Sequence, residues 1–176
     1  DVSNEATGKT LSVRTFFAAD AETTASDTLW SADAPWARTD ESSSQGSYSW
    51  TDSPGGNYEN DLDISLTSLT FSLADATRST IKFDHKYSLE TNGDFGYVEA
   101  SHTGGAYWDR LKTFTGYQND WTGVTLDLSS FDGRPEVMIR FRLLTDYSYT
   151  RDGWWVDDIQ VTADNVGLLT ADVSTN

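Results

Sequence analysis

The sequence predicts an all-β domain, a two-sheet antiparallel jelly-roll β-sandwich of roughly nine to eleven short strands. Apolar and polar residues alternate in many short runs, and turn-forming Gly, Pro, Asn and Asp residues separate these runs at regular spacing. The chain contains 7 Trp, 8 Tyr and 8 Phe, which favour strands, and no segment has the apolar periodicity of an amphipathic helix. A double-sheet jelly roll closes this many antiparallel strands around one core.

Length and charge limit the remaining possibilities. The 176 residues fit one domain, which we assign to 10–162, with polar tails at 1–9 and 163–176. The net charge of −16 argues against nucleic acid and anionic membrane surfaces as partners, because both need a basic patch. No apolar run approaches the length of a membrane span, so membrane insertion is not expected. An acidic surface suits a secreted or cell-surface setting, including a marine or halophilic one.

Other features bear on processing and redox chemistry. The chain starts at Asp1 without Met, so we expect a processed or excised segment. It has 0 Cys, which excludes disulfides and thiolate metal sites.

The first part of the chain alternates most clearly at its beginning. Leu11, Val13 and Thr15 would share one side of an initial strand. The segment 23–45 is expected to consist mainly of loops, with Trp30 and Trp36 as packing anchors. Strands are expected in this part at 10–17, 47–51 and 64–73.

The second part of the chain holds the clearest interior strand. Val137, Ile139, Phe141 and Leu143 alternate with Glu136, Met138, Arg140 and Arg142 over 136–144. The segment 80–89 alternates as strictly, and it places His85 on the apolar side. Strands are expected in this part at 80–89, 97–102, 107–114, 121–128, 136–144 and 152–161.

The closing strand contains an irregularity. Alternation fails at the adjacent Asp157 and Asp158, which indicates a β-bulge. Two carboxylates in an apolar strand are costly to bury alone, so we expect a cationic partner for at least one of them. The first and last strands of the domain, at opposite ends of the sequence, are expected to lie near each other.

Carboxylates gather in the loops between strands. Asp20 and Glu22, two residues apart after the first strand, would lie on one face of an extended chain. Oxygen-bearing side chains also crowd the segment 57–63. Such clusters are either solvated surface or sites for a hard cation such as Ca²⁺, which takes six to eight oxygen ligands. A further set flanks the middle and last strands as a second candidate site, and it consists of Glu90, Asp94, Asp146 and Asp152.

Aromatic residues in or beside loops offer a ligand-binding surface. Rings with a polar edge suit contact with polysaccharides and with proteins equally. The candidates are Trp36, Trp108, Tyr147 and Tyr149. A carbohydrate-binding module is therefore an alternative function, although jelly rolls host many functions.

Catalysis has the weakest support. Paired carboxylates can hydrolyse glycosides at defined separations, but their mere presence in an acidic chain is uninformative. The chain has 2 His. We expect His85 to lie in the core and His102 to be exposed at the end of a strand. No Ser-His-Asp or Cys-His set can be assembled from them. A glycoside-active enzyme is the least favoured hypothesis for the function.

Four segments in order resemble a known family. They are WTDSPGGNYENDLDISLTS, FDHKYSLETNGDFGYVEAS, WTGVTLDLSSFDGRPEVMIRFRL and DGWWVDDIQV. Together they resemble the MAM-like jelly-roll accessory domain of immune-inhibitor-A-type secreted bacterial metallopeptidases, and similar modules of bacillopeptidase-F-like subtilases. The resemblance covers about residues 16–161 and implies a MAM-like or galactose-binding-like fold. The zinc motif His-Glu-x-x-His of those peptidases is absent from this chain.

The resemblance also implies a function and a site. It implies a non-catalytic, calcium-stabilised accessory or binding module of a secreted bacterial protein, a peptidase or other hydrolase. Its partners would be a protein or polysaccharide surface and the remainder of the parent polypeptide. One structural Ca²⁺ would be held by Asp20, Glu22, Asn57, Asn60, Asp63, Asp157 and Asp158. Which of Asp20 and Glu22, and which of Asp157 and Asp158, contacts the ion stays open.

Overall fold

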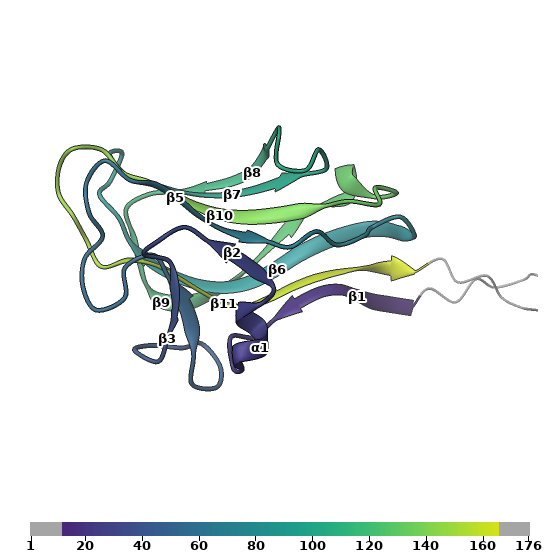
Figure 1. Cartoon of the computed structure of the whole chain (residues 1–176), viewed down its shortest axis with the longest axis horizontal. Coiled ribbons are helices and arrows are strands. Elements are labelled where there is room, and N and C mark those ends of the chain that lie inside the picture. Colours follow the sequence, from purple (N-terminus) through teal and green to yellow (C-terminus); the bar gives the residue numbers. More distant parts are fainter. Residues whose placement is uncertain (1–11, 166–176) are drawn as a thin grey trace, which may run out of the picture.

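The computed structural model describes residues 12–165, which form eleven strands in two antiparallel sheets (Figure 1). The sheets pack face to face as a β-sandwich, which confirms the predicted fold class. Helical structure in this range is confined to α1 (Thr24–Asp27) and a 3-10 turn η1 (Ser129–Phe131). Within the same range, no helix has the length and apolarity that a membrane crossing requires.

The first sheet has six strands. Its spatial order is β3 (Ala37–Thr39), β4 (Ser49–Thr51), β11 (Gly153–Asn165), β6 (Ala76–Ser88) and β9 (Tyr117–Asp127), and β1 (Ser12–Ala19) also pairs with β11. The second sheet has five strands. Its order is β2 (Trp30–Ala32), β5 (Asp63–Ser68), β10 (Met138–Leu144), β7 (Phe95–Ser101) and β8 (Asp109–Phe114).

The two ends of the domain meet, as expected. β1 pairs antiparallel with β11, with Phe17 opposite Val161 and Ser12 opposite Asn165. Figure 1 shows these two strands, purple and yellow, side by side. β11 continues to Asn165, beyond the expected domain end at 162. The expected tail at 1–9 lies outside the described residues, as does the expected tail at 163–176 from residue 166 onward.

β11 contains the predicted bulge. Asp157 lies opposite Asp84 of β6, whereas the next partners are Gln160 and Lys82, so β11 holds one extra residue between them. Asp158, inside this irregularity, has a φ of 47°. A bulge turns neighbouring side chains in different directions, and here it separates the surroundings of Asp157 and Asp158.

The segment 23–45 holds more regular structure than the sequence predicts. It contains α1, β2 and β3, none longer than 4 residues. Trp30 and Trp36 are buried here, as expected for packing anchors. Elements this short show no periodicity, so the sequence pattern could not distinguish them from loop.

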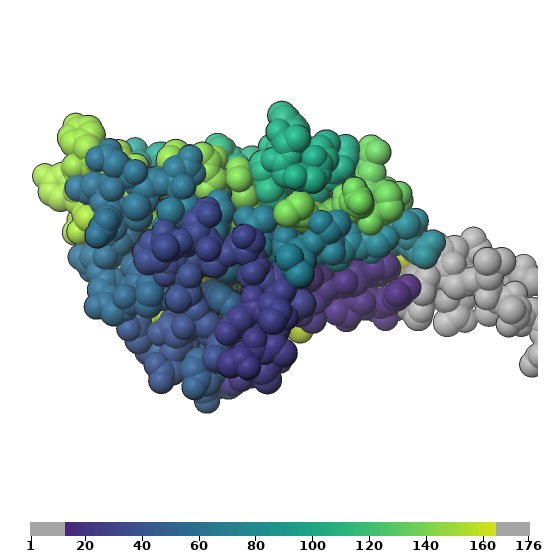
Figure 2. All heavy atoms as spheres, in the orientation of Figure 1, coloured from purple at the N-terminus to yellow at the C-terminus, as the bar shows by residue number. Residues whose placement is uncertain are grey.

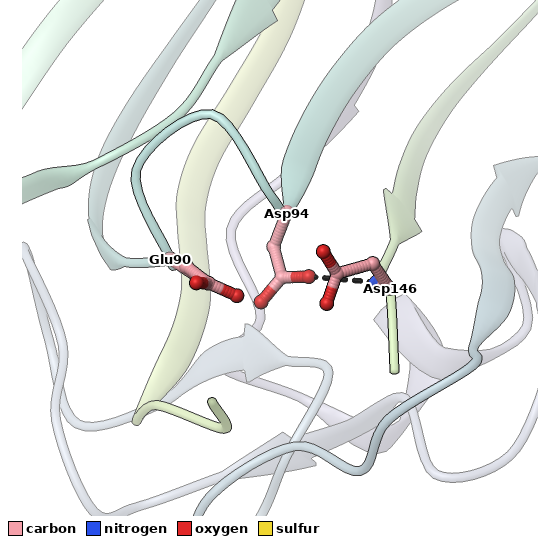
Figure 3. A group of neighbouring side chains, drawn as sticks. All are labelled: Glu90, Asp94 and Asp146. Atoms are coloured by element: carbon pink, nitrogen blue, oxygen red, sulfur yellow. Dashed lines mark hydrogen bonds between the residues drawn. The ribbon is translucent and has the colours of Figure 1, made fainter. Parts of the chain in front are cut away.

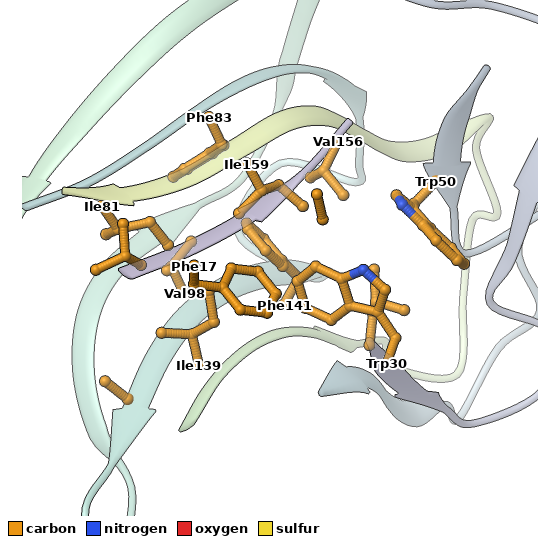
Figure 4. Packing of buried hydrophobic residues seen from close by; sticks show 14 of the residues in the cluster. Phe17, Trp30, Trp50, Ile81, Phe83, Val98, Ile139, Phe141, Val156 and Ile159 are labelled. Carbon is orange, nitrogen blue, oxygen red and sulfur yellow. The ribbon is translucent and has the colours of Figure 1, made fainter. Parts of the chain in front are cut away.

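The core fills the space between the sheets (Figure 4). Phe83 of the first sheet meets Phe141 of the second edge to face, with ring centroids 5.1 Å apart. His85 is buried, as its place in the pattern predicts, and its Nδ1 accepts a hydrogen bond from Trp154 Nε1 at 3.2 Å. Burial lowers the pKa of His85 to about 4, so the imidazole is neutral at pH 7.

Three loops converge at one end of the sandwich: 52–62, 89–94 and 145–152. We call this region the loop end. Asp61 N donates to Asp146 O at 2.7 Å, and Tyr58 N donates to Arg151 O at 2.9 Å. The 145–152 loop forms the tip of the molecule opposite the β1 and β11 ends (Figure 2). These main-chain bonds give the loop end a defined shape.

Candidate metal centre

Glu90, Asp94 and Asp146 form a carboxylate triad at the loop end (Figure 3). One carboxylate oxygen from each lies within 4.8 Å of the others. In residues 12–165 this is the one group of three or more His, Cys, Asp or Glu side chains so close together. Asp94 precedes β7 and Asp146 follows β10, so neighbouring strands of the second sheet bring them side by side.

Asp94 is the best-fixed member of the triad. Its side chain is fully buried, Oδ1 accepts a hydrogen bond from Asp146 N at 2.8 Å, and Oδ2 accepts one from the Tyr58 hydroxyl. Burial, and then the hydrogen bond to Asp94, raise the pKa of the Tyr58 phenol well above its ordinary value. Tyr58 therefore remains a donor to this carboxylate at all ordinary pH values.

Glu90 and Asp146, the other two members of the triad, are half-buried. Asp146 Oδ1 accepts from Ser148 N at 2.8 Å and from Ser148 Oγ at 3.0 Å. Gly93 leaves room for both carboxylates, because an added Cβ would lie 2.7 Å from Glu90 Oε2 and 3.1 Å from Asp146 Oδ2. The chain therefore places a residue without a side chain where these two groups approach.

The electrostatics of the triad favour a cation. Three carboxylates at this separation repel one another, and one of them is shielded from water. Across residues 12–165 no Lys or Arg forms an ion pair with any of the three. The donor set is all oxygen, which suits a hard divalent cation such as Ca²⁺ better than a thiolate- or imidazole-preferring metal.

Three of the four residues of the second candidate site are thus brought together. Asp152, the fourth, does not join the triad. It is exposed, its carbonyl accepts a hydrogen bond from Ser53 Oγ at 2.8 Å, and its charge contributes to raising the pKa of the buried Asp52.

The seven residues of the first candidate site are divided among three places, which corrects the expectation of one centre. Asn57 Nδ2 donates to Thr150 O at 3.4 Å, and Asn60 Nδ2 donates to Tyr147 O at 3.0 Å, so both lie at the loop end. Asp63 lies in β5 of the second sheet and forms an ion pair with Arg142 at 2.6 Å. None of these contacts involves the β11 aspartates, because those belong to the first sheet.

The other members of the first set do share one neighbourhood. The pKa of Asp158 is raised by burial and by the charges of Asp84, Asp20 and Glu22, with Lys82 acting in the opposite direction. This carboxylate-rich region also includes Asp84, which was not among the predicted site residues. Asp84 lies opposite Asp157 through the pairing of β6 with β11, which the local sequence pattern does not reveal.

The buried Asp157 is held by main-chain amides. Its Oδ2 accepts from Ser44 N at 2.8 Å and Gln45 N at 3.2 Å, and its Oδ1 accepts from Asp158 N at 2.8 Å. These amides satisfy the carboxylate without a side-chain charge. Burial still raises the pKa of Asp157, to about 6.

The four candidate ligand-binding aromatics have different surroundings. Trp36 is buried against Trp154, with ring centroids 6.3 Å apart, so it cannot meet an external ligand, and its assignment is corrected to core. Trp108 is half-buried beneath the Arg140 guanidinium at 4.2 Å. Tyr147 and Tyr149 are 80% and 68% exposed, next to Asp146.

Comparison with known proteins gives one sequence relative and several similar structures. No family model matches the chain. Over 112 residues, 64% of this chain, the sequence is 28% identical to Bacillopeptidase F of Bacillus subtilis. The matched stretch is 8% of that protein, so the chain spans a small part of its relative.

The similar structures support the fold. A family 22 carbohydrate-binding module of Clostridium thermocellum superposes with a TM-score of 0.59 and 9% identity, covering 88% of this chain and 96% of that one. The K3 cleaved adhesin domain of Lys-gingipain from Porphyromonas gingivalis gives 0.53 and 15%, covering 85% and 100%. The K2 adhesin domain of Lys-gingipain gives 0.55 and 17%, covering 84% and 98%. At these identities the likeness concerns architecture.

Proposed function

We propose that this domain is a non-catalytic, calcium-stabilised accessory module of a larger secreted or cell-surface bacterial protein, and that it mediates contact with a substrate or surface. The triad Glu90–Asp94–Asp146 carries the calcium part of the proposal. Ca²⁺ would be held by these carboxylates and by water, and it would join the loop after β6 to the loop after β10. The ion has a structural role here.

The accessory role is supported by the chain's size relative to its match. A stretch equal to 8% of Bacillopeptidase F is compatible with an attachment to a peptidase whose catalytic groups lie elsewhere. Within the described residues, His85 is unsuited to act as a base, because it is buried and its Nδ1 accepts a hydrogen bond from an indole. We also propose that the domain is related to the MAM-like accessory domain of immune-inhibitor-A-type peptidases.

Carbohydrate binding is a second candidate for the contact itself. Two highly exposed tyrosines, Tyr147 and Tyr149, lie on the same loop as Asp146. Solved structures with the same architecture include a xylan-binding domain, at a TM-score of 0.57 and 10% identity. Affinity electrophoresis in gels that contain neutral polysaccharides tests this function, with Tyr147→Ala and Tyr149→Ala as variants.

Thermal unfolding in metal-free buffer, with and without added CaCl₂, tests the calcium role. At 100 times its dissociation constant, an ion that binds only the folded state adds about 2.7 kcal/mol. For a chain of this size that corresponds to an increase of roughly 5–10 °C in Tm. We expect Glu90→Gln with Asp146→Asn to abolish most of the increase.

The control is Asp75→Asn, which removes an exposed carboxylate that forms no side-chain hydrogen bond in the described structure. It should keep the full response to calcium. An equal response to calcium in the triad variant would indicate that the ion binds at another site. Asp158→Asn would then test the carboxylate-rich region around Asp20 and Glu22. No response in the unmodified protein would refute the calcium role.

A further inference from the structure

The outer face of the second sheet carries a cluster of arginines. Val98, Ile139 and Phe141 point into the core, so their strand neighbours point outward. On this face Glu99 lies opposite Arg140 on one side and opposite Arg110 on the other. We call the surface formed by Tyr97, Glu99, Arg110, Arg140 and Arg142 the arginine face.

Positive charge is in excess on the arginine face. Arg140 donates from Nε and Nη2 to Glu99 Oε2 at 2.7 and 2.6 Å. Arg142 forms a two-bond pair with Asp63, at 2.6 and 2.7 Å. These two carboxylates each have a close arginine, and Arg110 reaches only the already paired Glu99, at 3.4 Å. In a chain with 28 acidic and 12 basic residues, this local excess is a distinctive feature.

Arg110 is held in a geometry that suits an external acceptor. Its guanidinium lies 3.6 Å from the centroid of the Tyr97 ring, and that ring stacks on Phe95 at an angle of 8°. Stacking fixes the plane of the guanidinium while 48% of the side chain stays exposed. A planar, oriented fork of N–H donors matches the two oxygens of a carboxylate.

Two aromatic residues directly precede β8, the strand that contains Arg110. Tyr107 is 67% exposed in the turn before β8, and the adjacent Trp108 lies under the Arg140 guanidinium. An exposed tyrosine ring can stack on the apolar face of a pyranose. A uronate residue presents such a face and a carboxylate on one rigid unit, which matches a ring and a guanidinium on one short segment.

We propose that the arginine face binds an acidic polysaccharide of the uronate class, with Arg110 pairing with a uronate carboxylate and Tyr107 contacting the sugar ring. This inference rests on the proposed role as a binding module and names a ligand class for it. The overall charge of −16 repels a polyanion at long range. At physiological ionic strength the screening length is about 8 Å, so distant carboxylates are screened while the local arginines remain effective.

Isothermal titration with short oligogalacturonates tests the proposal at about 0.15 M salt, where charges beyond the screening length matter little. Short oligomers avoid the cross-linking of long pectate chains by calcium. We expect saturable binding to the free acid, and at least tenfold weaker binding to the methyl-esterified oligomer. Arg110→Gln should reduce affinity for the free acid by about tenfold or more, consistent with loss of a charge-assisted pair. Arg110→Lys should recover only part of it.

Arg78→Gln is the matched control. Arg78 is an exposed arginine that pairs with Asp164 in the first sheet, so its loss should leave uronate binding unchanged. Equal binding of the free and esterified oligomers, or an unchanged affinity in a folded Arg110→Gln variant, would overturn the inference. Competition by poly-glutamate at equal carboxylate concentration would also overturn the saccharide class. Retention on neutral polysaccharide alone, or calcium stabilisation alone, would leave the accessory role standing while refuting this ligand.

Discussion

The phenol of Tyr58 donates a hydrogen bond to the buried carboxylate of Asp94, 36 residues later in the chain. The same hydroxyl accepts from Glu90 N at 3.0 Å. One side chain from the 52–62 loop thus joins the main chain of Glu90 to the carboxylate of Asp94 in the candidate metal centre.

Replacing Tyr58 with Phe should lower the free energy of unfolding by about 1–3 kcal/mol, because Asp94 would lose a donor while staying buried. The loss should be smaller in saturating calcium, since the ion would compensate part of the missing interaction. Urea unfolding with and without calcium measures both values. Tyr117→Phe is the control, because Tyr117 is 74% exposed. Equal effects at the two positions would contradict the structural role of Tyr58.

Replacing Gly93 with Ala should weaken calcium binding by about tenfold, because the new methyl group would displace Glu90 Oε2 from the triad. Calcium titration by calorimetry measures the change. Gly56→Ala is a close control, since a Cβ at Gly56 would meet no atom within 4 Å. The idea fails if both variants keep the same affinity.

Asp52 should make stability depend on pH. Its Oδ2 accepts from Trp154 N at 2.8 Å, Oδ1 has no hydrogen-bond partner in the described structure, and burial raises its pKa to about 7. The folded state therefore binds a proton that the unfolded state releases above its ordinary pKa of 3.8. The free energy of unfolding should fall between about pH 4 and pH 7 and stay lower above that.

Asp52→Asn, which stays neutral, isolates this effect. At pH 8 it should be more stable than the unmodified protein, by up to about 4 kcal/mol at 1.36 kcal/mol per unit of pKa shift. Near pH 4 the two should be similar. Urea unfolding of both proteins at both pH values tests this, and a stability difference that does not change with pH would exclude the proposed titration.

His85 should contribute acid sensitivity of the opposite sign. Burial depresses its pKa from 6.5 to about 4, so the unfolded state takes up a proton first as the pH falls. The associated stability is complete above pH 6.5 and is lost as the pH falls towards 4. Nitrogen-edited NMR should show a neutral ring with its proton on Nε2 down to about pH 4, because Nδ1 accepts from Trp154. A titration midpoint near 6.5 would contradict the buried hydrogen-bonded state.

The strand framework was largely predictable because long strands reveal their period. The alternation around Ile139 and Phe141 marked β10, and the interruption at Asp157 and Asp158 marked the bulge in β11. β2 and β3 were missed, because three residues are too few to show a period by themselves, whereas the equally short β4 lies within the expected strand 47–51. Their strand conformation depends on pairing with β5 and β4, which a local pattern does not reveal.

The candidate site was predictable only in part. Glu90, Asp94 and Asp146 stand beside strand ends in the sequence, and this position indicated that they could meet. Which loops pack together depends on tertiary folding, so the sequence did not show that Asn57 and Asn60 donate to the 145–152 loop. The partner of Asp157 was also hidden, because main-chain amides of a distant loop leave no signature in residue type.

The pairing of Ser12 with Asn165 has a mechanical consequence. Tension applied between these two positions would act across the antiparallel β1–β11 ladder at its open end. The hydrogen bonds would then be loaded one after another, as in a zipper, and not all together in shear. We therefore expect β1 to peel away at low force while the loop end, at the opposite pole of the sandwich, keeps its shape. Under such tension the domain would open first at the β1–β11 ladder, before the loop end deforms.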